Sequence, residues 1–176
     1  MLLAIVGVAL ALLAATPEAA EANCKGAGEG PRSITEAVAT KATICLINKE
    51  RRRRGLRKLT PQEDVSRAAR SHSNRMQETG CFAHECPGEP ALEGRLARAD
   101  YLPCGCSWGT GENIAWGSNN RASPSAIVDS WMESPPHRAI ILEGSFEHAG
   151  VGVEWGSPYE PHARAGTYTL NLGYRD

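Results

Sequence analysis

Six cysteines set the strongest limit on the structures open to this chain. They are Cys24, Cys45, Cys81, Cys86, Cys104 and Cys106. All of them follow an apolar N-terminal segment, and an even cysteine count in an exported chain is typical of a disulfide framework. A zinc ribbon is disfavoured because the paired C-x2-C spacing of such sites is absent. We expect one bridge between Cys24 and Cys45, with the other four cysteines close together around a loop.

The N-terminal segment predicts export. Residues 2–15 are all apolar or small, a run that is shorter than the about 20 residues needed to span a bilayer and that fits the centre of a signal peptide. Residues 20–22 form a small-x-small cleavage site, so we expect a signal peptide over 1–22, a flexible lead-in over 23–34 and one domain over 35–176. The protein is therefore expected to be secreted. No Lys or Arg precedes the apolar run, so a membrane anchor or a buried helix stays open as an alternative.

The charge of the chain indicates no class of partner on average, since the net charge is −1. A local basic run, KERRRRGLRK at 49–58, has two interpretations. It is a solvated helix end whose cations complement the helix dipole, or it contacts an anionic surface through Arg51, Arg52, Arg53 and Arg54. Specific nucleic-acid binding is disfavoured because no aromatic residues interleave with the run. We expect a monomer.

The order of the predicted elements is typical of an α+β fold, with helices first and strands late. Helices are expected over 35–54, 60–79, 91–99 and 123–134, and strands over 113–116, 149–155 and 166–174. Gly55 and Gly80 are predicted to end the first two helices.

Capping residues mark two of these helices most clearly. Thr60 is expected as an N-cap, with Pro61 in the first helical position and Glu63 completing a capping box. Ser123 is expected to cap the fourth helix, and Pro135 to end it. His137 directly follows the two prolines, which restrict the backbone there. This stiffness predicts either a packing role for His137 or a functional site.

Five segments of the chain resemble the CAP superfamily. AARSHSNRM, CFAHECPGEP, GENIAWG, SWMESPPHRAIIL and AGVGV occur in its order and spacing over 35–173. This superfamily includes cysteine-rich secretory proteins, insect venom antigens and plant pathogenesis-related proteins, and the chain is most similar to its bacterial secreted branch. The resemblance implies a three-layer α-β-α sandwich with an antiparallel sheet, here stabilised by disulfides.

The resemblance also implies a surface cleft lined by two histidines and acidic residues. The histidines fall on His84 and His137, and the first acid falls on Glu112. In the fourth position animal and plant members have a glutamate, whereas this chain has Ser134. The adjacent Glu133 is not an equivalent substitute, because one residue along a helix turns a side chain by about 100°.

These residue types allow several chemistries. His84, His137 and Glu112 match the ligand set of a catalytic zinc site, so zinc or another divalent cation is a candidate cofactor. Without a metal the same groups could exchange protons, and each could also serve only to hold a loop or turn. His72 lies on the apolar stripe of the second helix, where a buried histidine bonded to a neighbour is expected rather than a ligand.

Three functions stay open at this point. The favoured one is a binding module for a lipid, a sterol-like molecule or a cell-wall ligand, with a divalent metal as a further candidate ligand. The second is a metal-dependent peptidase or wall hydrolase, which is disfavoured because no G-x-S-x-G or H-E-x-x-H motif is present. The third is a non-catalytic structural or interaction protein with a vestigial cleft.

Overall fold

The computed structural model describes residues 23–102, 105–161 and 163–176. The expected signal peptide and Cys104 lie outside these residues. The elements in chain order are α1 (Glu36–Arg52), β1 (Thr60–Pro61), α2 (Glu63–Thr79), α3 (Leu92–Arg98), β2 (Trp108–Ser118), a 3-10 turn η1 (Asn119–Ala122), α4 (Pro124–Glu133), α5 (Pro135–Ile141), β3 (His148–Trp155) and β4 (Ala165–Arg175).

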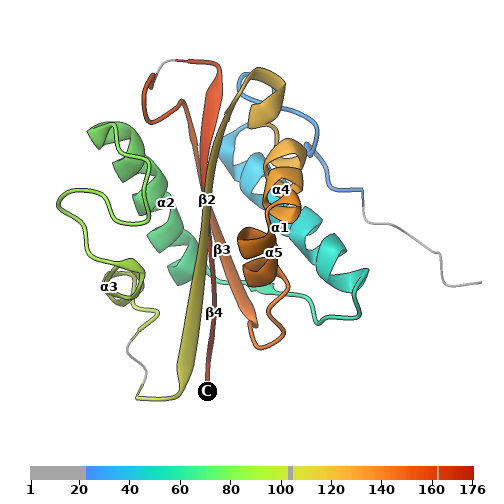
Figure 1. The fold of residues 1–176 in the computed structure, drawn as a ribbon, viewed down its shortest axis with the longest axis vertical. Coiled ribbons are helices and arrows are strands. Elements are labelled where there is room, and N and C mark those ends of the chain that lie inside the picture. The colour runs from blue at the N-terminus through green and yellow to red at the C-terminus, as the bar shows by residue number, and fades with distance from the viewer. Residues whose placement is uncertain (1–22, 103–104, 162) are drawn as a thin grey trace, which may run out of the picture.

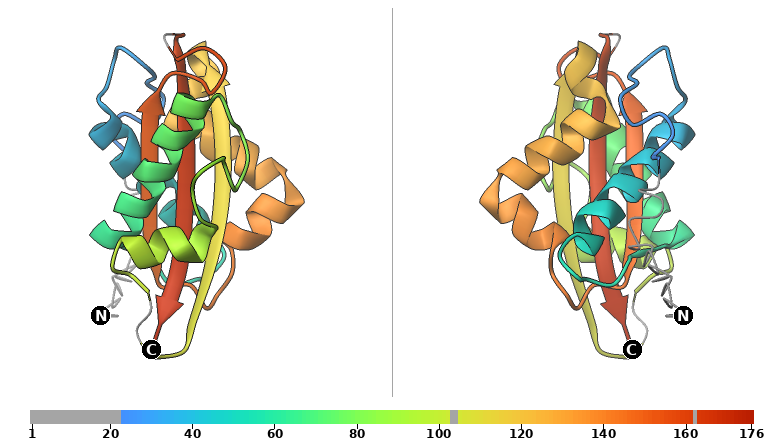
Figure 2. Two further views of the ribbon diagram at one scale, coloured as in Figure 1. Left: turned by 90° about the vertical axis from the view of Figure 1, so that its left-hand side faces the viewer. Right: turned by 90° about the vertical axis from the view of Figure 1, so that its right-hand side faces the viewer.

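Three layers make up the domain, as expected for an α+β sandwich. A four-stranded sheet of order β1-β3-β4-β2 forms the middle layer. Helices α2 and α3 cover one face, and α1, α4 and α5 cover the other (Figures 1 and 2). The sheet is mixed rather than wholly antiparallel, because β1 runs parallel to β3 while the other pairs are antiparallel. In the described part of the chain, no helix is both long enough and apolar enough to cross a membrane.

The predicted start of the second helix was wrong. Thr60 and Pro61 form the short strand β1, and Gln62 is the N-cap of α2. The N–H of Thr60 donates to the carbonyl of Glu147 at 2.7 Å, and the N–H of Gln62 donates to that of Ala149 at 2.9 Å. Pro61 lies between these two donors, so the ladder needs no N–H from it.

The Pro-Pro pair follows the end of α4, as predicted, and also has a second role. Ser123 caps α4 as expected, since its Oγ accepts a hydrogen bond from the N–H of Ala126 at 3.4 Å. Pro135 begins α5 instead of only ending α4, because proline fits the first helical position, where its missing donor is not needed. His137 therefore lies in the first turn of α5 and not at the C-terminal end of α4.

Strand β2 is longer than the predicted stretch over 113–116. It pairs with β4 along its whole length, from Trp108 opposite Arg175 to Ser118 opposite Ala165. Its glycines suggested a loop, but at Gly117 an added Cβ would lie 2.1 Å from the carbonyl oxygen of Arg121. The glycine is thus required by a close backbone approach rather than by flexibility.

Disulfides tie the N-terminal segment and one loop to the helices. Cys24 is bonded to Cys45 in α1, as predicted, and Cys81 is bonded to Cys86. Cys106 is also disulfide-bonded. The Cys81–Cys86 bridge closes the loop that follows α2, and this loop carries the first candidate histidine.

Candidate functional site

His84 lies on the loop between α2 and α3, inside the Cys81–Cys86 bridge. Gly80 ends α2 in the left-handed conformation, as predicted, and so turns the chain into this loop. The carbonyl of His84 accepts a hydrogen bond from Nη2 of Arg95 at 3.1 Å. The loop is therefore fixed by a covalent bridge and by a buried arginine, while the imidazole itself stays 58% exposed.

Glu112 extends from β2 under this loop and is buried. Its Oε1 accepts a hydrogen bond from Nδ1 of His84 at 2.8 Å. Nη2 of Arg95 donates to both carboxylate oxygens, at 3.0 and 2.8 Å. The hydrogen bond to Glu112 raises the pKa of His84 above its ordinary value, and burial opposes this effect only in part.

His137 is held from a different direction. Its Nδ1 is 2.7 Å from Oγ of Ser134, and its carbonyl accepts a hydrogen bond from Nδ2 of Asn113 at 3.0 Å. Burial lowers the pKa of His137, and the positive charge of His84 lowers it further. The charge of His84 thus acts on His137, and their respective partners Glu112 and Asn113 are adjacent residues on β2.

Ser134, and not Glu133, contacts the second histidine. Glu133 instead lines a separate hollow beside Trp116 and Arg121. The position where animal and plant relatives have a glutamate is therefore occupied here by a neutral hydroxyl that bonds to His137.

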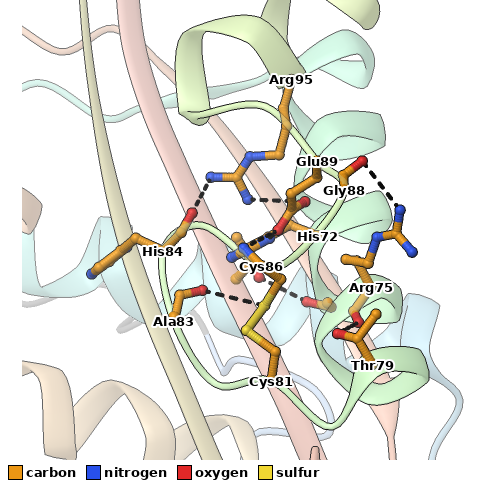
Figure 3. Close-up of polar contacts among 12 residues, drawn as sticks. His72, Arg75, Thr79, Cys81, Ala83, His84, Cys86, Gly88, Glu89 and Arg95 are labelled. Carbon is orange, nitrogen blue, oxygen red and sulfur yellow. Dashed lines mark hydrogen bonds and ion pairs between the residues drawn. A yellow bond between two sulfur atoms is a disulfide. The ribbon is translucent and has the colours of Figure 1, made fainter.

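A buried network next to these residues was not predicted. Nδ1 of His72 lies 2.7 Å from Oε1 of Glu89, and the same oxygen accepts the N–H of Cys86 at 2.9 Å (Figure 3). His72 is fully buried, and burial lowers its pKa. Its Nε2 makes no hydrogen bond and lies 3.9 Å from Oε1 of Glu112. His72 is thus bonded to a neighbour, as predicted. That neighbour, Glu89, links His72 to the backbone of Cys86 in the loop after α2.

Arg95 and Glu89 are the two site residues that sequence reasoning missed. Arg95 joins Glu112 to the His84 loop, and its Nη1 lies 3.9 Å from Oε2 of Glu89. The only local signal is an arginine directly before the buried Leu96 in a short helix. That signal resembles an ordinary solvated helix face, so it could not have identified the arginine as part of a site.

The donor set determines how a metal would have to bind. Among residues 23–102, 105–161 and 163–176, no three His, Cys, Asp or Glu side chains are grouped to hold a metal ion. Glu112 is a poor direct ligand, because both of its oxygens are bonded to Arg95. Nδ1 of His84 and Nδ1 of His137 are each bonded to a protein oxygen, while Nε2 of each has no hydrogen-bond partner in the described part of the chain. In metal-ligating histidines the second ring nitrogen is usually oriented by a neighbour in this way, so Nε2 is the atom of each imidazole that could ligate a cation.

A large cavity lies away from these histidines, at the β1 edge of the sheet, where it is lined by α1 from one face and by α2 from the other. Its volume is about 700 Å³, and it is lined by Glu36, Ala37, Thr40, Lys41, Ile44, Pro61, Glu63, Ser66, Arg70 and Val153. The lining residues of each helix recur every three or four positions in the sequence, so one face of α1 and one face of α2 form walls of the cavity.

Comparison with known proteins places this architecture among relatives. The model of the family described as "CAP: Cysteine-rich secretory protein family" matches residues 45–160. The Bacillus subtilis protein YkwD is 37% identical over 120 residues, which are 66% of this chain and 43% of YkwD. The Bacillus subtilis membrane protein YlbC is 32% identical over 116 residues, which are 65% of this chain and 31% of YlbC. The match to this chain thus covers less than half the length of either relative.

Solved structures show the same fold. An extracellular protein with an SCP domain from Bacillus anthracis has a TM-score of 0.64 at 26% identity, over 78% of this chain and 40% of that one. An outer surface protein from Borrelia burgdorferi has a TM-score of 0.66 at 17% identity, over 81% of this chain and 97% of that one. The three-layer fold and these matches lead to one conclusion: the chain belongs to the CAP, or cysteine-rich secretory protein, family.

Proposed function

We propose that this CAP protein is an extracellular binding domain that holds a single-chain lipid with an anionic head group between α1 and α2. The observation that carries the proposal is the cavity of about 700 Å³ between these helices. This volume lies within the range of about 300–1,000 Å³ that is usual for small-molecule sites.

The walls of the cavity suit an acyl chain. Ala37 and Ile44 supply apolar surface from α1, and Pro61 and Val153 supply it from the strands β1 and β3. Each methylene buried against such walls contributes about 0.8 kcal/mol. Ligand affinity should therefore depend on chain length.

The charged residues around the cavity suit an anionic head group. Glu63 and Arg70 pair with each other, at 2.5 Å between Oε1 and Nη2. Lys41 is exposed and has no carboxylate partner within the described ranges. Lys41 is therefore the cation that we expect to meet the head group.

Disulfides and relatives support an extracellular location. Disulfide bonds persist in oxidising compartments, and the chain has bridges at Cys24–Cys45 and Cys81–Cys86. The Bacillus anthracis relative is described as extracellular, whereas YlbC is described as a membrane protein.

Native mass spectrometry and fluorescence displacement with a C16 fatty acid test the proposal. Ala37→Phe should fill the cavity and weaken binding, while Ala139→Phe places the same ring on an exposed site outside the cavity. A C14 acid should bind about tenfold more weakly than the C16 acid, since two buried methylenes contribute about 1.6 kcal/mol. Equal affinities for both chain lengths, or for both phenylalanine variants, would refute a lipid site in this cavity, and binding of wall fragments alone would replace it with a wall-ligand function.

A metal-dependent hydrolase is the second candidate, and the partner-free Nε2 atoms of His84 and His137 favour it. A bound divalent cation would supply a Lewis acid and an activated water. Calorimetry with zinc should then show saturable binding that is lost in the His84→Ala, His137→Ala double variant. Absence of zinc binding, together with independent titration of the two histidines, would favour the third interpretation, a vestigial cleft.

A further inference from the structure

A second pocket lies between α2, α3 and the loop that joins them, apart from the α1–α2 cavity. Its volume is about 180 Å³. Four arginines line it, namely Arg67, Arg75, Arg95 and Arg98, and the only carboxylate in the lining belongs to Glu89. The lining therefore has a clear excess of positive charge.

Two of these guanidinium groups are not neutralised by the protein. Arg67 is paired with Asp64 at 2.9 Å and with Asp100 at 3.4 Å. Arg75 donates only to the carbonyl of Gly88, at 3.3 Å, and no carboxylate in the described segments pairs with Arg75 or Arg98. Gly88 has a φ of +81°, and an added Cβ would lie 3.2 Å from Nη2 of Arg75, so the glycine makes room for this guanidinium.

The buried side chain of Arg95 is a second, independent observation that indicates an anionic ligand for this pocket. It is 4% exposed, and its Nη2 donates to Glu112 and to the carbonyl of His84. Its Nη1 lies 3.9 Å from Oε2 of Glu89, which is beyond hydrogen-bond distance. Nε and Nη1 of Arg95 are buried without any hydrogen-bond partner. Figure 3 shows the Gly88–Glu89 segment between the side chains of Arg95 and Arg75. Buried charged donors without acceptors are costly, so an acceptor bound in the pocket would remove this cost.

We propose that this pocket binds a phosphate-type oxyanion. Guanidinium groups match phosphate oxygens through paired N–H donors. The pocket is smaller than the about 300 Å³ at which sites for drug-sized ligands begin, but it can hold one phosphate group with a few waters. The anion has two chemical sources, free inorganic phosphate or a phosphate group of a larger molecule such as a phosphodiester polymer.

Titration of the oxidised protein with inorganic phosphate, followed by calorimetry and by amide NMR shifts, tests the proposal. The Arg75→Gln, Arg98→Gln double variant alters two half-buried or exposed side chains and leaves the buried network intact. The Arg52→Gln, Arg121→Gln double variant is the matched control, because it removes the same charge outside the pocket. Glycerol 3-phosphate and poly(glycerol phosphate) are titrated in parallel.

We expect saturable phosphate binding with amide shifts centred on α3 and the 86–90 loop, at least tenfold weaker in the pocket variant and within about twofold of wild type in the control. Tighter binding of the polymer per phosphate group would identify a phosphodiester as the source, and tighter binding of inorganic phosphate would identify the free ion. Equal weakening in both double variants, or phosphate binding no tighter than acetate binding, would overturn the proposal.

Discussion

Arg51 provides the most direct test of how this domain is held together. Its side chain is fully buried, although it begins the run of four arginines that sequence reasoning assigned to a solvated or membrane-facing surface. Its guanidinium donates to the carbonyls of Arg57, Ile141, Glu143 and Phe146, at 2.9, 2.8, 2.8 and 3.2 Å. These bonds join the end of α1 to the end of α5 and to the segment before β3. Arg51 is therefore excluded from any anionic-surface contact, which leaves only Arg52, Arg53 and Arg54 for that role.

Arg51→Met removes the donors while keeping much of the side-chain volume. The bonds to Ile141 and Phe146 are wholly buried, so water cannot readily replace the lost donor at these two carbonyls. A buried acceptor left without a partner costs about 1–3 kcal/mol, and the buried charge that disappears offsets part of this loss. We expect the free energy of unfolding to fall by about 3 kcal/mol, which corresponds to roughly 6–12 °C in melting temperature for a chain of this size.

Urea unfolding of the oxidised protein, monitored by tryptophan fluorescence, measures this change. Arg52→Met is the matched control, because Arg52 is the next residue along the same helix but is exposed, and it should change stability by less than about 0.5 kcal/mol. If the two variants lose the same stability, then the four carbonyl contacts contribute nothing beyond a surface charge and the reasoning fails.

Two further predictions concern the cleft and the sheet. The pKa of His84 is raised by Glu112, so this pair should stabilise the fold fully below the unfolded histidine pKa of about 6.5 and lose that effect as pH rises through the higher folded value. The difference in unfolding free energy between wild type and His84→Gln should therefore shrink as pH rises. A difference that grows with pH would contradict the role given to the His84–Glu112 pair. Gly152→Ala should destabilise the fold by about 3 kcal/mol or prevent folding, since an added Cβ would lie 2.3 Å from backbone atoms of Ala69 in α2. Gly28→Ala is the control and should be close to neutral, because an added Cβ there has nothing within 4 Å. Equal unfolding free energies for the two variants would show that α2 does not pack tightly on β3.

Elements with local signals were predictable from the sequence. Ser123 caps α4 with its side-chain oxygen, and Gly80 ends α2 in the left-handed conformation. The strands β3 and β4 follow the alternation of apolar and polar residues. In each case the residues that form the structure lie within a few positions of one another, so no knowledge of the tertiary fold was needed.

Elements that depend on distant partners were not predictable. The segment from Thr60 to Glu63 has the composition of a capping box, but its backbone donors find acceptors at Glu147 and Ala149. Strand pairing therefore competed with helix capping and won at Thr60 and Pro61. The same reason applies to β2, whose glycines are explained only by its contacts with other segments.

The candidate site divides along the same line. His84, Glu112 and His137 were identified through a resemblance between motifs. In the structure His84 bonds to Glu112, and the charge of His84 lowers the pKa of His137. Arg95 and Glu89 were missed, because a buried charged side chain has no local pattern that separates it from a solvated one. They nevertheless connect the cleft to the arginine-lined pocket.

Replacement of Ser134 by glutamate tests whether the departure from the animal and plant pattern sets the state of the second histidine. Ser134 makes no side-chain hydrogen bond that caps α5, so its only side-chain role in the described structure is the 2.7 Å contact with Nδ1 of His137. A carboxylate in that position would favour the imidazolium and should raise the pKa of His137 by about one or more, reversing its present direction. Ser134→Gln keeps a polar side chain of similar size without the charge and should leave that pKa low, as should Glu133→Gln, which alters a carboxylate outside the contact. An NMR pH titration of His137 in the three variants decides the matter: a rise confined to Ser134→Glu shows that the serine keeps this histidine neutral near physiological pH, whereas an equal response in Ser134→Gln would mean that burial alone controls it.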